Sequence, residues 1–136
     1  MNRRELQTKL STVTSALLRE KGYISYPDLF MALGYLDQKK YEDWRFRRVS
    51  CLERVITTNL ARVSFIMKAV RASSLNGRLK PSQTAYRSWG RGPKVPLRFS
   101  KSGHPAIEEL WATHFLSRRG AAAEETKSIE AHRSFI

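Results

Sequence analysis

Cysteine, acidic side chains and long apolar runs are all scarce in this sequence of 136 residues. The single cysteine, Cys51, excludes an internal disulfide framework and argues against a zinc site built from several thiolates. No stretch approaches the roughly 18 consecutive apolar residues that indicate a membrane-spanning helix, and the basic N-terminus lacks the apolar segment of a secretory signal. We therefore expect a cytoplasmic protein whose length suits one domain with a single core.

Acidic side chains are scarcest in the middle of the chain. Residues 50–103 contain 11 Lys and Arg but a single acid, Glu53, within a chain whose formal net charge is +13. Residues 104–136, by contrast, hold 4 basic and 5 acidic side chains. Positive charge concentrated in one segment is the electrostatic footprint of a protein that binds a polyanion. The alternative is a basic protein with no bound polyanion.

Capping signals predict three helices in the first half of the chain, at residues 2–22, 25–34 and 37–48. Each segment begins at an Asn, Ser or Asp that can cap a helix, and the first two end at a glycine. Apolar residues recur within them at helical spacing. The third segment is expected to turn Tyr41 and Trp44 toward the core.

Two further helices are predicted in the second half. Ser50 and Glu53 have the spacing of a capping box, and the apolar residues behind them predict one long central helix to about residue 74, roughly 36 Å in length. A last helix is expected to begin near Pro105. Its predicted buried stripe consists of Ile107, Leu110, Trp111, His114 and Phe115.

Residues 84–100 are expected to form a β-hairpin. Residues 84–89 are rich in β-branched and aromatic side chains, residues 90–94 form a turn cluster, and residues 95–100 alternate apolar and polar with period two. Pro96 confines the second strand to an edge. The predicted fold is therefore mainly helical: about five helices packed around the long central one, with one basic β-hairpin. Residues 1–119 would form a single domain and residues 120–136 a flexible tail.

The hairpin region combines positive charge with aromatic and turn residues. Ser88–Gly103 carries four basic side chains and no acidic one, together with Trp89 and Phe99. Lys and Arg contact phosphates, and an exposed tryptophan that stacks on a base contributes about 1–3 kcal/mol. Phe99 is expected in the core, while Trp89 fits either the core or a stacking role. The predicted nucleic-acid contacts are Arg62, Arg71, Arg78, Lys80, Arg87, Trp89, Arg91, Lys94, Arg98 and Lys101.

The segment YISYPDLFMALGYLDQKKYEDWRFRR resembles a helix-turn-helix. That resemblance implies a turn at Gly34 and a second helix that enters the major groove of DNA. The sequence departs from the pattern at Glu42 and Asp43, which would face or flank phosphates. A helical hairpin with a purely structural role is the alternative.

Catalytic and metal-binding patterns are weak in this sequence. Asp28 and Asp37-Gln-Lys39 spell the motif of a PD-(D/E)xK nuclease, but that chemistry places its carboxylates on adjacent strands, and both aspartates here fall at helix starts. The histidines 104, 114 and 132 have no spacing typical of a metal site. We therefore predict a non-catalytic protein without a cofactor that binds DNA or RNA, with the basic β-hairpin and the basic face of the long helix contacting phosphates. The alternative is an interaction module or inhibitor that docks on the acidic surface of a partner protein.

Overall fold

The computed structural model describes residues 2–118 and 120–122, and these form a mainly helical fold with a small antiparallel sheet. The helical class predicted from the sequence is confirmed. The predicted tail, residues 120–136, lies outside the described residues from position 123 onward. In chain order the elements are α1 (Arg3–Lys21), β1 (Tyr23–Ile24), α2 (Tyr26–Ala32), α3 (Gln38–Arg45), the 3-10 helix η1 (Leu52–Val55), α4 (Leu60–Asn76), β2 (Lys80–Gln83), α5 (Pro105–Trp111) and β3 (Thr113–Leu116).

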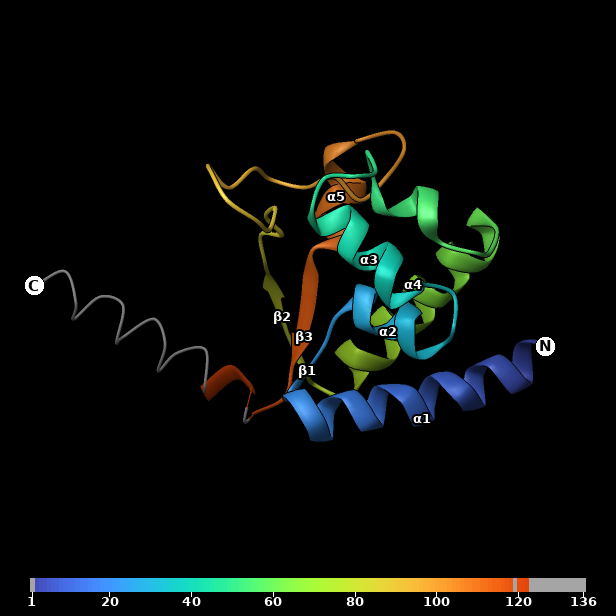
Figure 1. The fold of residues 1–136 in the computed structure, drawn as a ribbon. Helices are drawn as coiled ribbons and strands as arrows, with labels where there is room; N and C mark the ends of the chain where they lie inside the picture. The colour runs from blue at the N-terminus through green and yellow to red at the C-terminus, as the bar shows by residue number, and fades with distance from the viewer. Residues whose placement is uncertain (1, 119, 123–136) are drawn as a thin grey trace, which may run out of the picture.

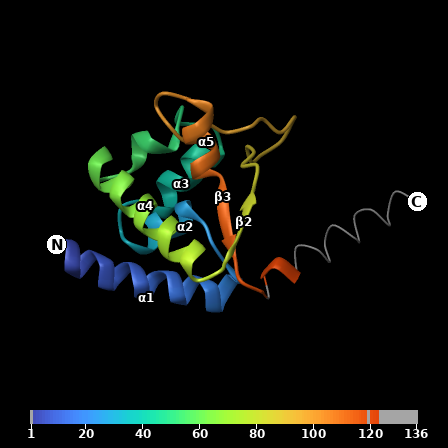
Figure 2. The same ribbon diagram turned by 180° about the vertical axis from the view of Figure 1, so that it is seen from behind.

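The three strands form a sheet in the order β1-β3-β2, with both pairs antiparallel. Helix α1 lies across one end of this sheet, and α2, α3 and α4 lie on one side of it in both views (Figures 1 and 2). The chain after β2 continues beyond the sheet at the end opposite α1 (Figure 1). The chain after β2, which contains the predicted hairpin, therefore occupies one end of the molecule.

The three predicted helix starts are confirmed. Side-chain oxygens of Asn2, Ser25 and Asp37 each accept a hydrogen bond from a backbone N–H group in the first turn of α1, α2 and α3. Gly22 closes α1 in the left-handed conformation, at φ 80°. Helix α3 ends at Arg45, three residues before the predicted end. Local capping chemistry was sufficient to place these starts.

The predicted long helix over residues 50–74 is wrong at its beginning. Residues 52–55 form only η1, Ile56 is extended at ψ 127°, and α4 starts after Asn59, whose side chain caps it. The backbone N–H of Thr57 donates to the carbonyl oxygen of Tyr35 at 2.8 Å. A contact with the α2–α3 connection therefore replaces a helical hydrogen bond, in a β-branched run with low helix propensity.

The predicted last helix is also too long. Helix α5 ends at Trp111, and residues 113–116 form β3, which is paired on both sides. Trp111 and Phe115 are buried as predicted, but Ile107 and Leu110 are exposed. A short apolar run is compatible with either a helix or a strand. Residues 113–116 form a strand because β1 and β2, which are distant in sequence, pair with them.

An aromatic cluster in the core holds the hairpin region against the helices. Phe99 is buried, as predicted, and its ring stacks on Trp111 with centroids 5.7 Å apart. Trp44 of α3 lies 5.0 Å from Phe99 and donates its indole N–H to the carbonyl oxygen of Arg98 at 2.8 Å. The end of the hairpin region, at Arg98 and Phe99, is therefore tied to the core.

Candidate nucleic-acid interface

Residues 84–100 form the predicted hairpin with little regular strand pairing. A single antiparallel bridge joins Arg87 to Pro96, and backbone hydrogen bonds of 2.8 and 2.9 Å flank it. Gly90 and Gly92 have φ values of 103° and 91°, a region that side chains disfavour. Pro96 has no backbone N–H group to donate to the opposite strand, which is consistent with a single bridge between the two strands.

The C-terminal end of α3 anchors this hairpin. The carbonyl oxygen of Arg45 accepts from the backbone N–H of Trp89 at 2.8 Å, and its guanidinium donates to the carbonyl oxygen of Arg87 at 2.8 Å. The same guanidinium lies 4.6 Å from the ring centroid of Tyr86 and 5.0 Å from that of Trp89. Arg45 was not among the predicted site residues, because its sequence neighbours carry no sign of this distant contact.

Trp89 is partly packed and partly available. Its ring meets Tyr41 and Phe46 edge to face, at centroid distances of 5.8 and 5.7 Å, and 42% of the residue is exposed. The packing role considered for it is therefore shown in part, and the stacking role stays a prediction. It fixes the hairpin to α3 and still presents an indole surface that could stack on a base.

Six exposed cationic side chains surround the hairpin, and we call them the hairpin surface. Arg47, which sequence reasoning missed, lines a hollow of about 290 Å³ together with Arg98. Among the described residues, the ion pairs within 4.0 Å are Lys21–Asp28 and Arg48–Asp43, so none of the six belongs to one. The hairpin surface consists of Arg47, Arg87, Arg91, Lys94, Arg98 and Lys101.

Two carboxylates hold the base of the hairpin through backbone groups. Glu108 accepts from the N–H groups of Phe99 and Ser100 at 2.8 Å each, and Glu53 accepts from the N–H of Lys101 at 2.7 Å. Carboxylates that accept two backbone N–H groups make stronger hydrogen bonds than neutral acceptors. The nearby acids therefore fix the shape of the loop.

We predict that Glu108→Gln lowers the free energy of unfolding by about 1–3 kcal/mol, because the new amide NH₂ would face a backbone donor. Urea unfolding followed by tryptophan fluorescence measures this change. Glu109→Gln is the matched control, since Glu109 is exposed and carries the same charge. Equal midpoints for the two variants would contradict the role assigned to Glu108.

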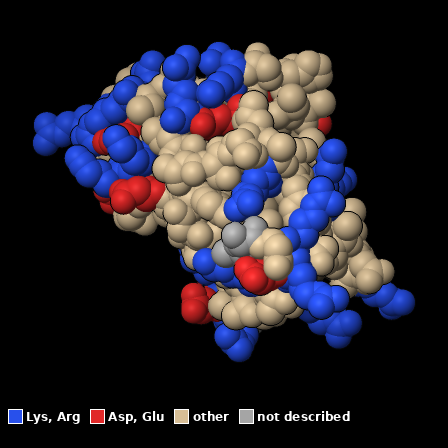
Figure 3. Space-filling model, turned by 90° about the vertical axis from the view of Figure 1, so that its right-hand side faces the viewer, with Lys and Arg blue, Asp and Glu red and all other residues tan. Residues whose placement is uncertain are grey.

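The other predicted contact residues lie away from the hairpin. Arg62, at the start of α4, is half-buried and donates to the hydroxyl of Tyr35 at 3.0 Å. Arg71 is also half-buried on α4, whereas Arg78 and Lys80 are exposed at the end of the sheet near α1. Figure 3 shows Lys and Arg at several places on the helical side of the molecule, with few Asp and Glu between them. The predicted set is thus divided between at least two regions.

The segment that resembles a helix-turn-helix has the expected turn, since Gly34 has φ 84°. Lys39 and Lys40 are exposed on α3, while Trp44 is buried and the end of the helix is occupied by the hairpin. Only the first half of α3 therefore presents basic groups to solvent. Groove reading by this helix stays a prediction.

Other singled-out residues have structural contacts. Cys51 is fully buried, and His104 caps α5 by accepting from a backbone N–H at 3.2 Å. Asp37 caps α3, and Asp28 pairs with Lys21. Within residues 2–118 and 120–122, no cluster of three or more potential metal ligands occurs, and none of the helices there has the length and apolarity to cross a membrane.

Comparison with protein-family models, with curated proteins and with solved structures finds no match for this chain.

Proposed function

We propose that this protein binds nucleic acid without catalysing a reaction, and that the hairpin surface provides its main phosphate contacts. One observation carries the proposal: six exposed cations gather around one loop, and none has a carboxylate partner among the described residues. A polyanion would supply the missing counter-charge, and the release of its condensed counterions would favour binding. The scarcity of cysteine supports a cytoplasmic location for this activity.

The anchoring of the loop favours such binding. Arg45, Trp44 and Glu108 hold the hairpin backbone through hydrogen bonds from α3 and α5. A loop that is ordered before binding loses less conformational entropy when phosphates engage its side chains. Trp89 adds an indole surface beside these cations, which suits a strand with accessible bases.

The alternative is a module that docks on an acidic protein surface. The exposed rings of Phe46 and Trp89 beside arginines favour it, since Trp and Arg are enriched in the energetic centres of protein interfaces. Such a partner would place carboxylates where the first proposal places phosphates.

The absorbance spectrum of protein purified at low salt discriminates between the two proposals. A nucleic-acid binder with a net charge of +13 is expected to retain host nucleic acid, visible as absorbance at about 260 nm that nuclease or high salt removes. A preparation free of nucleic acid that retains one acidic polypeptide would favour the interaction module.

A further inference from the structure

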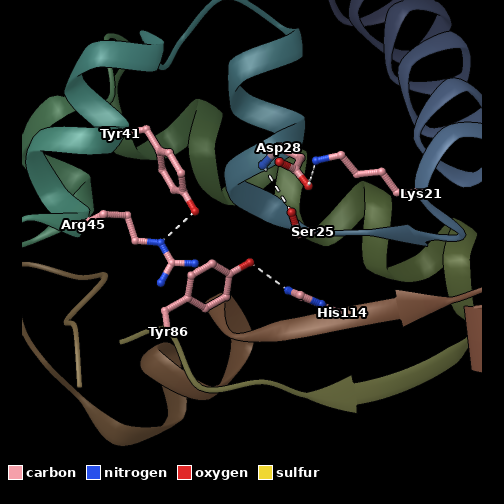
Figure 4. A network of polar contacts seen from close by, with 7 residues as sticks. All are labelled: Lys21, Ser25, Asp28, Tyr41, Arg45, Tyr86 and His114. Carbon is pink, nitrogen blue, oxygen red and sulfur yellow. Dashed lines mark hydrogen bonds and ion pairs between the residues drawn. The ribbon is translucent and has the colours of Figure 1, made fainter. Parts of the chain in front are cut away.

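A polar pocket separate from the hairpin surface lies between the helices and the sheet. Its volume is about 340 Å³, at the small end of the range for ligand sites, and its lining comes from α1, β1, α2, α3, the segment after β2, and β3. Residues from five of these segments point toward one another across the pocket (Figure 4). They include Lys21, Asp28, Tyr41, Arg45, Tyr86 and His114.

Three polar pairs organise this pocket. The ammonium of Lys21 lies 3.0 Å from a carboxylate oxygen of Asp28. The Nε–H of Arg45 donates to the hydroxyl of Tyr41 at 2.9 Å. On the opposite wall the hydroxyl of Tyr86 lies 2.7 Å from Nε2 of His114, whose ring stacks on Tyr23. The polar groups are therefore held in place before any ligand arrives.

The pocket is positively charged and contains hydrogen-bond donors without an acceptor among the described residues. The two positive charges of Lys21 and Arg45 exceed the one negative charge of Asp28, which leaves a formal charge of +1 when His114 is neutral. The guanidinium of Arg45 uses Nε–H for Tyr41 and one Nη1–H for the carbonyl oxygen of Arg87. Its remaining N–H groups make no hydrogen bond to a described residue. Figure 4 shows this guanidinium between the rings of Tyr41 and Tyr86.

The hydroxyl groups of Tyr41 and Tyr86 in this pocket have raised pKa values. Burial raises the pKa of the Tyr41 hydroxyl, against the opposing effect of the hydrogen bond from Arg45, and the charges of Asp28 and Lys21 act on it as well. Burial likewise raises the pKa of Tyr86. Both hydroxyls therefore stay protonated near neutral pH, and the Tyr41 hydroxyl, which accepts from Arg45, retains its proton for donation to an anion.

We infer that this pocket binds a phosphate monoester, either at the terminus of a nucleic-acid strand or on a free nucleotide. That the monoester belongs to the terminus of a nucleic-acid strand rests on the proposed function. That the pocket binds a phosphate monoester rests only on the groups that line it. A monoester carries about −1.5 to −2 charges near neutral pH, more than an internal phosphodiester, and gains more from a positive site. The planar fork of Arg45 suits two phosphate oxygens, and Lys21 supplies a second cation while it neutralises Asp28.

The test uses the full chain and single-stranded oligonucleotides of one sequence with a 5′-phosphate, a 3′-phosphate or hydroxyls at both ends. Fluorescence anisotropy is expected to show about tenfold tighter binding of at least one phosphorylated form, as one added charged hydrogen-bond contact would give. A second arm compares a nucleoside 5′-monophosphate with its nucleoside by calorimetry. Lys21→Gln, which leaves the pocket formally neutral, is expected to abolish the preference in both arms.

Lys9→Gln is the matched control, because Lys9 is exposed on α1 and does not line the pocket. It should keep the preference for phosphate. Arg45 is unsuitable as the first variant because it also holds the hairpin. Equal binding of all the oligonucleotides, with no preference for monophosphate over nucleoside, would overturn the pocket inference and leave nucleic-acid binding intact. Monophosphate binding that needs Lys21, without any oligonucleotide binding, would uphold the pocket and contradict the proposed function.

Discussion

Replacing Arg91, Lys94 and Arg98 together with alanine should weaken binding to every nucleic acid and flatten its salt dependence. Each lost phosphate contact removes about 0.9 from the slope of log K against log salt for duplex DNA, and about 0.7 for single strands. The slope should therefore fall by about 2–3. If affinity at 1 M salt is unchanged, this corresponds to a loss on the order of a hundredfold at 0.1 M salt.

The control for this triple variant removes the same charge elsewhere. Arg4 and Lys9 on α1 and Lys68 on α4 are exposed and lie outside the hairpin surface. Their replacement by alanine should preserve most of the salt slope, and circular dichroism should show both triple variants folded. An equal loss of slope in the two triple variants would assign binding to overall charge and contradict the proposed interface.

Trp44→Ala is expected to cost about 3–5 kcal/mol of unfolding free energy, the largest stability effect that we predict. Trp44 is fully buried, contacts Phe99 and Tyr86, and donates to the carbonyl oxygen of Arg98. The substitution leaves a cavity beneath the hairpin and removes one of its anchors. Because small domains have only about 5–15 kcal/mol of stability, the variant should be close to unfolding. Urea denaturation followed by circular dichroism measures the change.

Two further variants separate the causes of that loss. Trp44→Phe keeps an aromatic ring but removes the donor to Arg98, and should cost less than the alanine variant. Trp89→Ala removes the same residue type from a site that is 42% exposed, so its cost should also be smaller. A Trp44→Ala midpoint equal to that of Trp89→Ala would contradict a core that supports the hairpin.

The parts of the fold that the sequence predicted correctly depend on local chemistry. The caps at Asn2, Ser25 and Asp37 and the glycine after α1 involve residues within a few positions of one another. The errors arise where distant contacts decide the conformation. Thr57 bonds to Tyr35, and residues 113–116 find strand partners on both sides. Neither partner is evident from local spacing.

The candidate site was predictable to a similar degree. Charge and turn composition located the hairpin, and the burial of Phe99 followed from its alternating pattern. Arg45 and Arg47 were missed because the approach of α3 to the hairpin depends on tertiary packing through Trp44. The pocket was missed for the same reason, since its lining comes from six separate segments. Arg78 and Lys80 were predicted as contacts alongside the hairpin residues, but they lie just before and at the first residue of β2, whereas the hairpin follows the last residue of that strand.

The most direct measurement is fluorescence anisotropy of the wild-type protein with matched double-stranded DNA, single-stranded DNA and RNA probes over a series of salt concentrations. If the hairpin surface is a nucleic-acid interface, binding should have a steep salt slope and clearly favour one probe class. Weak binding that is equal for all probes and disappears near physiological salt would contradict it, and would direct the search to an acidic protein partner.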